Sequence, residues 1–293
     1  MKLAARAARI VPSPTLSITA TAKAMLAQGL DVIDFASGEP DFDTPEPVKA
    51  AAEAAIRAGF TKYTASSGID ELRLAIAEKL QAEQGLRYDK SQILVSCGAK
   101  HSLYNLAEAL FQAGDEVVIP SPFWVSYQDQ VLLNDATPVL LPTHEADGYA
   151  VHRQALEERL TPRTKAIIVN SPCNPTGATY DRAILEGIAE VALRHDLVII
   201  SDEIYEKILY DGARHISIAS LGPDVAARTV VINGVSKAYA MTGWRIGYAA
   251  GPKELITAMA NIQSQSTSIP GSFWLKAAVG EVVGGESFPR LIV

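Results

Sequence analysis

The sequence predicts a three-layer α/β protein in which helices cover both faces of a mostly parallel central sheet. From residue 92 onward, short β-branched apolar runs alternate with helical patterns, which is the order of right-handed strand–helix–strand crossovers. Runs such as residues 197–200 are apolar without alternation, which indicates strands buried on both faces. With 293 residues, 48% of them hydrophobic and 20% charged, the chain is long enough for a large core.

The pattern of apolar residues, prolines and glycines places the individual elements. Pro45 and Pro47 favour the first turn of a helix, and Gly29 favours a helix end. Helices are expected at residues 18–28, 46–58, 70–84 and 101–110. Strands are expected at residues 32–35, 93–95, 116–119, 165–169, 197–200 and 245–250, and in a β-branched run that begins at residue 230.

Composition excludes several classes of protein. The net charge of -7 and the absence of a basic run argue against binding to nucleic acid. No apolar run is long enough to predict a transmembrane helix. No Gly-x-Gly-x-x-Gly motif follows a predicted strand, which disfavours a dinucleotide-binding dehydrogenase. The first ten residues are basic and rich in alanine but lack the apolar core of a secretory signal, and we interpret them as an amphipathic arm.

The two cysteines, Cys97 and Cys173, show no spacing typical of metal ligands. We therefore expect free thiols in a reducing compartment, no bound metal and a cytoplasmic location.

Polar and aromatic residues gather where the predicted strands end. In open α/β sheets, ligands bind beyond the carboxyl ends of the strands. We therefore expect one site that contains residues from several strand ends: Lys100, Trp124, Asn174, Asp202, Tyr205, Ser236 and Lys237.

Lys237 and Arg245 are the first candidates for chemistry at this site. A lysine just past a buried strand loses part of its solvation, which lowers its pKa and makes it a candidate nucleophile toward an aldehyde. The planar guanidinium of Arg245 suits a phosphate. Pyridoxal phosphate carries both groups. Both side chains could equally belong to a surface loop.

Three other segments leave two interpretations open. The turn Gly98-Ala99-Lys100 enters a helix and could bind an anion with its backbone N–H groups, although alone it is a weak signal. Trp124 could fill the core or stack on a planar ligand. Asn174 lies in a turn fixed by two prolines and a glycine, where its amide could hydrogen-bond a ligand.

Four ordered motifs resemble those of class I aminotransferases, which are fold-type I pyridoxal-phosphate enzymes. They are Asn174-Pro175-Thr176-Gly177, Asp202-Glu203-Ile204-Tyr205, Ser236-Lys237 and Gly243-Trp244-Arg245-Ile246-Gly247. Residues 38–45, 62–63 and 122–127 are similar to the prokaryotic-type aspartate aminotransferase branch. The resemblance covers about residues 10–268.

The resemblance implies roles for the central residues. Lys237 would hold pyridoxal 5'-phosphate as an internal aldimine and then move the proton between the substrate α-carbon and the cofactor. Asp202 would pair with the pyridine nitrogen. Tyr205 and Asn174 would hydrogen-bond the phenolic oxygen, and Trp124 would stack on the ring.

The resemblance also implies how phosphate and substrate bind. The phosphate would contact backbone N–H groups at Gly98, Ala99 and Lys100, the side chains of Ser236 and Arg245, and Tyr63 of a second subunit, which implies a homodimer. Substrate-binding residues would be Gly38, Trp124 and Asn174, with Ser13, Thr15 and Lys100 near a distal acidic side chain.

One departure concerns the C-terminal part of the family pattern. Family chains continue into a small domain whose arginine binds the substrate α-carboxylate, and no equivalent can be placed here. We therefore expect a truncated chain with three parts: residues 1–45 as an N-terminal arm and part of the small domain, residues 46–275 as the cofactor-binding large domain, and residues 276–293 as the start of an incomplete small domain.

The expected function is amino-group transfer between an amino acid, aspartate or glutamate, and a 2-oxo acid by a ping-pong route. Two alternatives stay open. One is another fold-type I enzyme, such as a β-lyase, that shares the cofactor residues. The other is a cofactor-binding remnant without efficient turnover.

Overall fold

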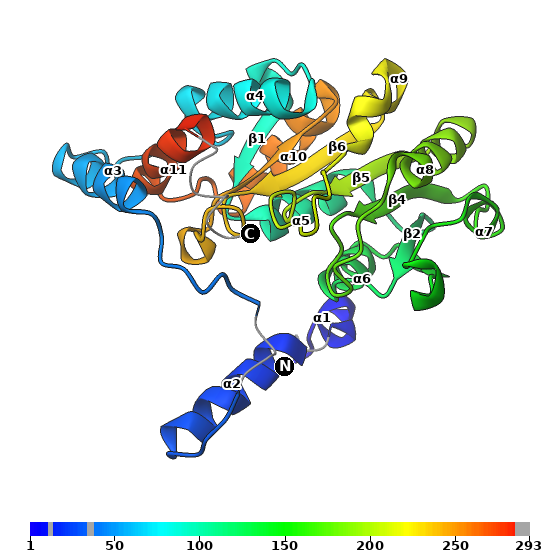
Figure 1. The fold of residues 1–293 in the computed structure, drawn as a ribbon, viewed down its shortest axis with the longest axis horizontal. Coiled ribbons are helices and arrows are strands. Elements are labelled where there is room, and N and C mark those ends of the chain that lie inside the picture. The colour runs from blue at the N-terminus through cyan, green and yellow to red at the C-terminus, as the bar shows by residue number, and fades with distance from the viewer. Residues whose placement is uncertain (11–13, 34–37, 285–293) are drawn as a thin grey trace.

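A computed structural model describes residues 1–10, 14–33 and 38–284. Its sheet has seven strands in the order β1-β7-β6-β5-β4-β2-β3 (Figure 1). β7 runs antiparallel to both of its neighbours, and the other neighbouring pairs are parallel. The strands are β1 (Ile93–Ser96), β2 (Glu116–Ser121), β3 (Thr137–Pro142), β4 (Thr164–Asn170), β5 (Val198–Asp202), β6 (Thr229–Gly234) and β7 (Gly247–Ala250). The predicted mostly parallel sheet is confirmed.

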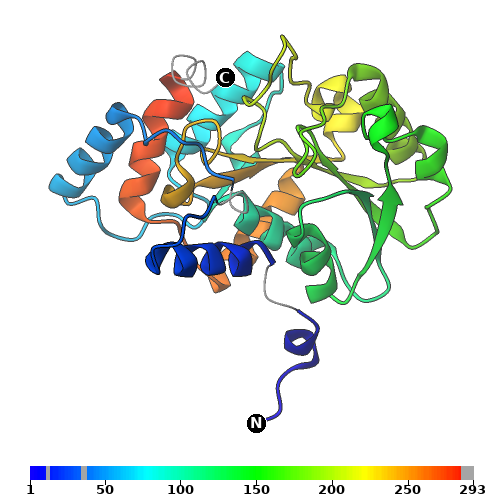
Figure 2. The ribbon, with the colours of Figure 1, turned by 60° about the horizontal axis from the view of Figure 1, so that its bottom comes forward.

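Helices cover both faces of the sheet, as Figure 2 shows. One face packs against α5 (Ala99–Leu110), α6 (Ser126–Leu133) and α10 (Lys253–Gln265). The other face packs against α3 (Glu46–Arg57), α4 (Asp70–Gln84) and α11 (Ser272–Gly284) on one half, and α7 (Arg153–Glu157), α8 (Arg182–Arg194) and α9 (Pro223–Ala226) on the other. Adjacent residues Ile167 and Ile168 belong to cores on opposite faces, because strand side chains alternate. This explains the unbroken apolar runs.

The N-terminal helices lie outside these layers. α1 (Ala5–Arg9) and α2 (Pro14–Ala27) form an arm that extends from the body (Figure 1). Arg9 of α1 forms an ion pair with Asp135, which follows α6. Gly29 has a φ of +77° just after α2, as expected for a helix end.

Some element boundaries differ from the predictions. α5 begins at Ala99 rather than at residue 101, because Gly98, at a φ of +87°, turns the chain directly into the helix. β7 begins at Gly247 rather than at residue 245, because Arg245 has a left-handed φ of +54°. Of the strand expected at residues 32–35, the first two lie in no regular element and the last two are outside the described residues.

The sequence pattern did not reveal β3, the edge strand of the sheet. It contains Pro138 and Pro142 and is largely exposed. Proline is tolerated at an edge because one side of such a strand has no ladder to join. Composition alone does not distinguish such a strand from a loop.

Strand direction brings the ends of many strands to one edge of the sheet. β1, β2, β4, β5 and β6 run the same way, so their carboxyl ends share that edge. β7 runs the opposite way and pairs Gly247 with Gly234. Arg245, just before β7, therefore lies at the same edge as the chain leaving β6.

α11 packs on α3 and α4 through a core that includes Leu275 and Ala278. The division of the chain into residues 1–45, 46–275 and 276–293 stays a prediction. Cys97 and Cys173 form no disulfide, as expected. Within the described ranges, no helix is long and apolar enough to cross a membrane.

Candidate active site

A cavity of about 740 Å³ opens at the carboxyl edge of the sheet. Its walls come from the chain after β2, β4, β5 and β6, from the start of α5, and from the segment before α3. Of the predicted site residues, it brings together Gly38, Ala99, Lys100, Trp124, Asn174, Asp202, Tyr205, Ser236, Lys237 and Arg245.

Asp202, the last residue of β5, is the buried carboxylate of this cavity. Tyr127 Oη donates a hydrogen bond to its Oδ2 over 2.7 Å, and the Ile204 N–H donates to Oδ1 over 3.2 Å. Burial raises the pKa of Asp202 to about 6, although these two hydrogen bonds oppose the rise. A cationic ligand group beside Asp202 would favour its ionised form.

Asn174 and Tyr205 meet at the side of the cavity. Asn174 Nδ2 donates to Tyr205 Oη over 3.3 Å. Burial and the nearby Asp202 raise the pKa of Tyr205 to about 12, so its hydroxyl stays neutral. Asn170 holds the arrangement from behind: its Nδ2 donates to the Asp202 main-chain oxygen, and its Oδ1 accepts from the Asn174 N–H.

Lys237 extends into the cavity from the chain that follows β6. Its Nζ lies 5.7 Å from the centre of the Tyr205 ring and donates to the main-chain oxygen of Gly38. Burial lowers the pKa of Lys237, Glu39 opposes this change, and Arg245 adds to it. Because a larger fraction of the amine is then uncharged at neutral pH, Lys237 is a better nucleophile and base than a fully solvated lysine.

One end of the cavity combines the Arg245 guanidinium with the first backbone N–H groups of α5. The first N–H groups of α5, at Ala99 and Lys100, have no acceptor within the helix, and they attract anions. The Arg245 guanidinium lies so close to Gly98 that a Cβ there would overlap it. A Cβ on Gly247 would likewise overlap the backbone of Ala99. Two glycines therefore create this cradle.

Trp124 and Lys100 line the remaining wall. The Lys100 Nζ lies 4.8 Å from the centre of the Trp124 ring, and that ring meets Tyr127 edge-on at 5.4 Å. Burial and Arg245 lower the pKa of Lys100. Trp124 thus lines the cavity while its contacts with Tyr127 and Lys100 hold its ring in place.

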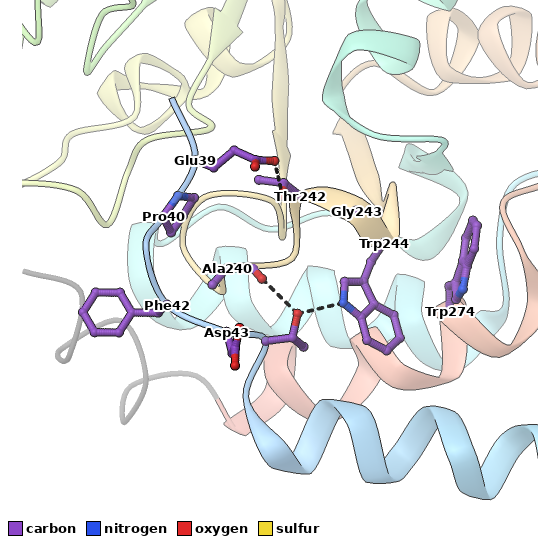
Figure 3. Close-up of a pocket in the computed structure, with 10 residues that line it drawn as sticks. Glu39, Pro40, Phe42, Asp43, Ala240, Thr242, Gly243, Trp244 and Trp274 are labelled. Carbon is purple, nitrogen blue, oxygen red and sulfur yellow. Dashed lines mark hydrogen bonds between the residues drawn. The ribbon is translucent and has the colours of Figure 1, made fainter. Parts of the chain in front are cut away.

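A second hollow of about 450 Å³ adjoins the cavity and lies between residues 39–44, the loop 240–244 and Trp274 (Figure 3). Trp244 Nε1 donates to Thr44 Oγ1 over 2.8 Å, and Thr44 Oγ1 donates to the Ala240 oxygen over 3.0 Å. Thr242 Oγ1 donates to Glu39 over 2.8 Å. These bonds fasten the segment that carries Gly38 to the loop between Lys237 and Arg245.

Some predicted site residues lie outside the cavity. Tyr63 is 93% exposed. Gly98 lies behind Arg245 and is absent from the cavity wall. Ser13 is outside the described residues, as is the side chain of Thr15.

Sequence reasoning missed the roles of Tyr127 and Asn170. Asn170 is the last residue of β4 and matched the strand-end signal, so it could have been found. Tyr127 is the second residue of α6, where no local signal separates it from a core residue.

The comparisons with known proteins agree with this geometry. The family model described as aminotransferase class I and II matches residues 30–288. The chain belongs to this family. It is 50% identical to the aspartate aminotransferase of Geobacillus stearothermophilus over 97% of this chain and 72% of that protein. It is 51% identical to an aspartate/prephenate aminotransferase of Cereibacter sphaeroides over 96% of this chain and 70% of that protein.

Solved structures of aminotransferases have the same fold. The Thermus thermophilus aspartate aminotransferase with maleate superposes with a TM-score of 0.96 at 42% identity, over 100% of this chain and 75% of that one. The Rhizobium meliloti aspartate aminotransferase gives 0.95 at 47% identity, over 100% and 73%. These likenesses support pyridoxal-phosphate-dependent aminotransferase function.

The residues present fit pyridoxal 5'-phosphate, the cofactor of this family. Lys237 offers an amine for its aldehyde, and Asp202 offers a carboxylate for its ring nitrogen. Arg245 and the first residues of α5, which Gly98 and Gly247 allow to approach closely, offer a guanidinium and backbone N–H groups for its phosphate.

Proposed function

We propose that this chain transfers amino groups between an acidic amino acid, aspartate or glutamate, and a 2-oxo acid, with Lys237 as its central catalytic residue. The observation that carries the proposal is the meeting in one cavity of Asp202, at the end of β5, with Lys237 and Arg245, from the connection between β6 and β7. The aspartate aminotransferase names of relatives near 50% identity support the choice of substrate.

The cofactor supplies an aldehyde for the substrate amine and a ring that accepts electrons from the α-carbon. Lys237 contributes a partly desolvated amine. As a base, this amine would take the proton from the substrate α-carbon and deliver it to the cofactor.

Asp202 and its partners set the charge at the ring end of the site. The ionised carboxylate of Asp202, oriented by the hydrogen bond from Tyr127, would accept a hydrogen bond from a protonated ring nitrogen. Tyr205 and Asn174 would hydrogen-bond the phenolic oxygen, and Trp124 would stack on the ring.

The remaining cavity residues bind and orient the ligands. Arg245, Ser236 and the start of α5 hold the phosphate. Gly38 contacts the substrate carboxylate through its backbone. Lys100, whose ammonium lies at the Trp124 ring, attracts the distal carboxylate, together with Ser13 and Thr15.

We also propose a homodimer in which Tyr63 completes the partner's phosphate site. The large exposed fraction of the Tyr63 side chain leaves it available for such a contact. Within this proposal residues 46–275 form the cofactor-binding domain and the protein works in the cytoplasm.

The proposal is tested by the visible absorption spectrum of the protein with pyridoxal phosphate, recorded before and after L-aspartate is added. We expect a visible band that requires Lys237, is absent from Lys237→Ala and bleaches with aspartate. A band that ignores aspartate and other amino acids would favour a cofactor-binding remnant. Release of ammonia together with a 2-oxo acid would favour a lyase. A band that persists in Lys237→Ala would contradict the assignment of Lys237.

A further inference from the structure

The turn after β5 faces the cavity on one side and the protein interior on the other. Asp202 and Tyr205 line the cavity, whereas the side chains between and after them, Glu203 and Glu206, do not. Glu203 and Glu206 are almost fully buried. The charge of these two carboxylates must therefore be compensated within the protein.

Glu203 is bound by three side chains. Ser201 and Ser217 donate to its Oε1 over 2.8 and 2.7 Å, and His215 Nε2 lies 3.0 Å from its Oε2. Burial alone would raise the pKa of Glu203, but His215 and the two serines hold it below its ordinary value.

Glu206 is bound from α4. Lys79 Nζ donates to its Oε1 over 2.5 Å and Gln84 Nε2 to its Oε2 over 2.8 Å. Lys79 also pairs with Glu83, which pairs with Lys207, each over 2.9 Å. We call Lys79, Glu203, Glu206 and His215, together with Glu83 and Lys207 at their more accessible edge, the buried ion cluster.

Charge balance in the buried ion cluster indicates the state of His215. Three carboxylates face two ammonium groups, so a protonated His215 makes the total neutral. His215 is packed among Glu203, Glu206 and Lys79, with Tyr88 also near Glu203. Burial would lower the pKa of His215, but Glu203 and Glu206 raise it against the opposing effect of Lys79.

A metal ion is a poorer interpretation of the same residues. Ligand atoms of Glu203, Glu206 and His215 lie within 4.8 Å of one another in the described part of the chain. However, each oxygen of both carboxylates already accepts a hydrogen bond or faces His215. The Lys79 ammonium supplies the cation.

We propose that Glu203 and protonated His215 are positioning residues that fix the Asp202–Tyr205 turn from behind and keep the negative charge of Glu203 from acting on Asp202. Asp202 and Glu203 are adjacent, and the charge of Glu203 favours protonation of Asp202. A cation on Glu203 cancels this effect. The inference rests on the proposed function, because it concerns the residue that would face the cofactor ring.

The test is the pH midpoint of the Lys237-dependent visible band in the full, cofactor-loaded chain. In His215→Gln, Glu203 loses its counter-charge, and the more negative potential stabilises protonated groups in the cavity. We expect the midpoint to rise by roughly 0.5 to 1 pH unit, the shift that a unit charge about 12 to 24 Å away produces at an effective dielectric constant near 20. In the double variant Glu203→Gln/His215→Gln the midpoint returns toward that of the unaltered protein.

The control is His152→Gln, which removes an exposed histidine paired with Asp147 over 2.7 Å and should leave the midpoint unchanged. A purely structural role predicts that the double variant is at least as disturbed as His215→Gln, and that result would overturn the proposal. An unchanged midpoint in His215→Gln would do the same. Absence of any Lys237-dependent band would instead refute the proposed function.

A second measurement covers the case in which His215→Gln does not fold. The imidazole of His215 can be titrated by NMR in the unaltered, cofactor-loaded protein. We expect its pKa to lie above the ordinary value, because Glu203 and Glu206 face it. Titration at or below its ordinary value near 6.5 would overturn the proposal.

Discussion

Lys79 is buried and Lys237 is partly buried, and the two regions that hold them shift the lysine pKa in opposite directions. Burial alone would lower the pKa of Lys79, but Tyr248, Glu206 and Glu83 raise it well above its ordinary value. Burial lowers the pKa of Lys237, and the opposing effect of Glu39 does not compensate, because Arg245 is also near. The placement of carboxylates therefore decides whether a buried amine is a structural cation or a reactive base.

The largest difference between Lys79 and Lys237 should be in their contribution to turnover. Lys237→Ala removes the amine that binds the cofactor aldehyde and moves the α-proton, so we expect turnover to fall by about 10⁴-fold or more. The measurement is the rate of 2-oxo acid formation from L-aspartate. Lys165→Ala, which removes a surface lysine paired with Asp115, is the matched control. Turnover within tenfold of the unaltered protein would remove Lys237 from the mechanism.

The free energy of unfolding should depend more on Lys79 than on Lys237, the reverse of the order expected for turnover. Lys79→Met leaves Glu206 buried without its ammonium partner, and we expect a loss of about 3–5 kcal/mol in the free energy of unfolding. Lys237→Met removes one hydrogen bond to Gly38 and should change it by about 1 kcal/mol or less. Urea unfolding of the cofactor-free protein, followed by circular dichroism, measures both. Equal losses would mean that the two environments do not differ as described.

Asp202 should make the free energy of unfolding depend on pH. Its pKa of about 6 in the folded protein lies above the ordinary value of 3.8, so the folded state holds the proton more tightly than the unfolded state. The resulting stability is fully present below about pH 4 and is lost as the pH rises through 6, a change of about 3 kcal/mol.

Asp202→Asn should remove this dependence and make the cofactor-free protein more stable above pH 6, while pyridoxal phosphate binds more weakly. Unfolding at pH 4.5 and 7.5, with cofactor titration at pH 7.5, checks both expectations. The exposed Asp211 provides the control Asp211→Asn. If Asp202→Asn is less stable than the unaltered protein at pH 7.5, then burial of the charged Asp202 carboxylate does not destabilise the folded protein.

Local pattern predicted one part of the site because strand ends can be recognised from sequence. Asp202, Asn174 and Lys237 each follow a β-branched or apolar run, and parallel strands bring such positions to one edge. The same reasoning predicted the layers, the helices α2 to α5 and every strand except β3, but it assigned no bounds to α6 through α11. It could not give the direction of β7, which depends on pairing with β1 and β6.

The supporting residues could not be predicted because their partners are far apart in the chain. Lys79 and Glu206 are separated by 127 positions, and Tyr127 and Asp202 by 75. Nothing near Lys79 in the sequence distinguishes it from the exposed lysines of other helices. Only packing of α4 behind the β5 turn shows that its charge is required there.

The smallest expected effect concerns the hydrogen bond between Asn174 and Tyr205, which tests how far the cavity is pre-arranged. Tyr205→Phe removes the hydroxyl that accepts from Asn174 but keeps the ring near Lys237. We expect turnover to fall about five- to tenfold, as for a hydrogen bond of about 1 kcal/mol. A double-mutant cycle with Asn174→Ala isolates the pair. If the Tyr205 hydroxyl and the Asn174 amide act together, the turnover of the double variant should be little lower than that of either single variant. Fully additive losses would mean that each group contacts the ligand independently, and that the 3.3 Å contact does not organise the site.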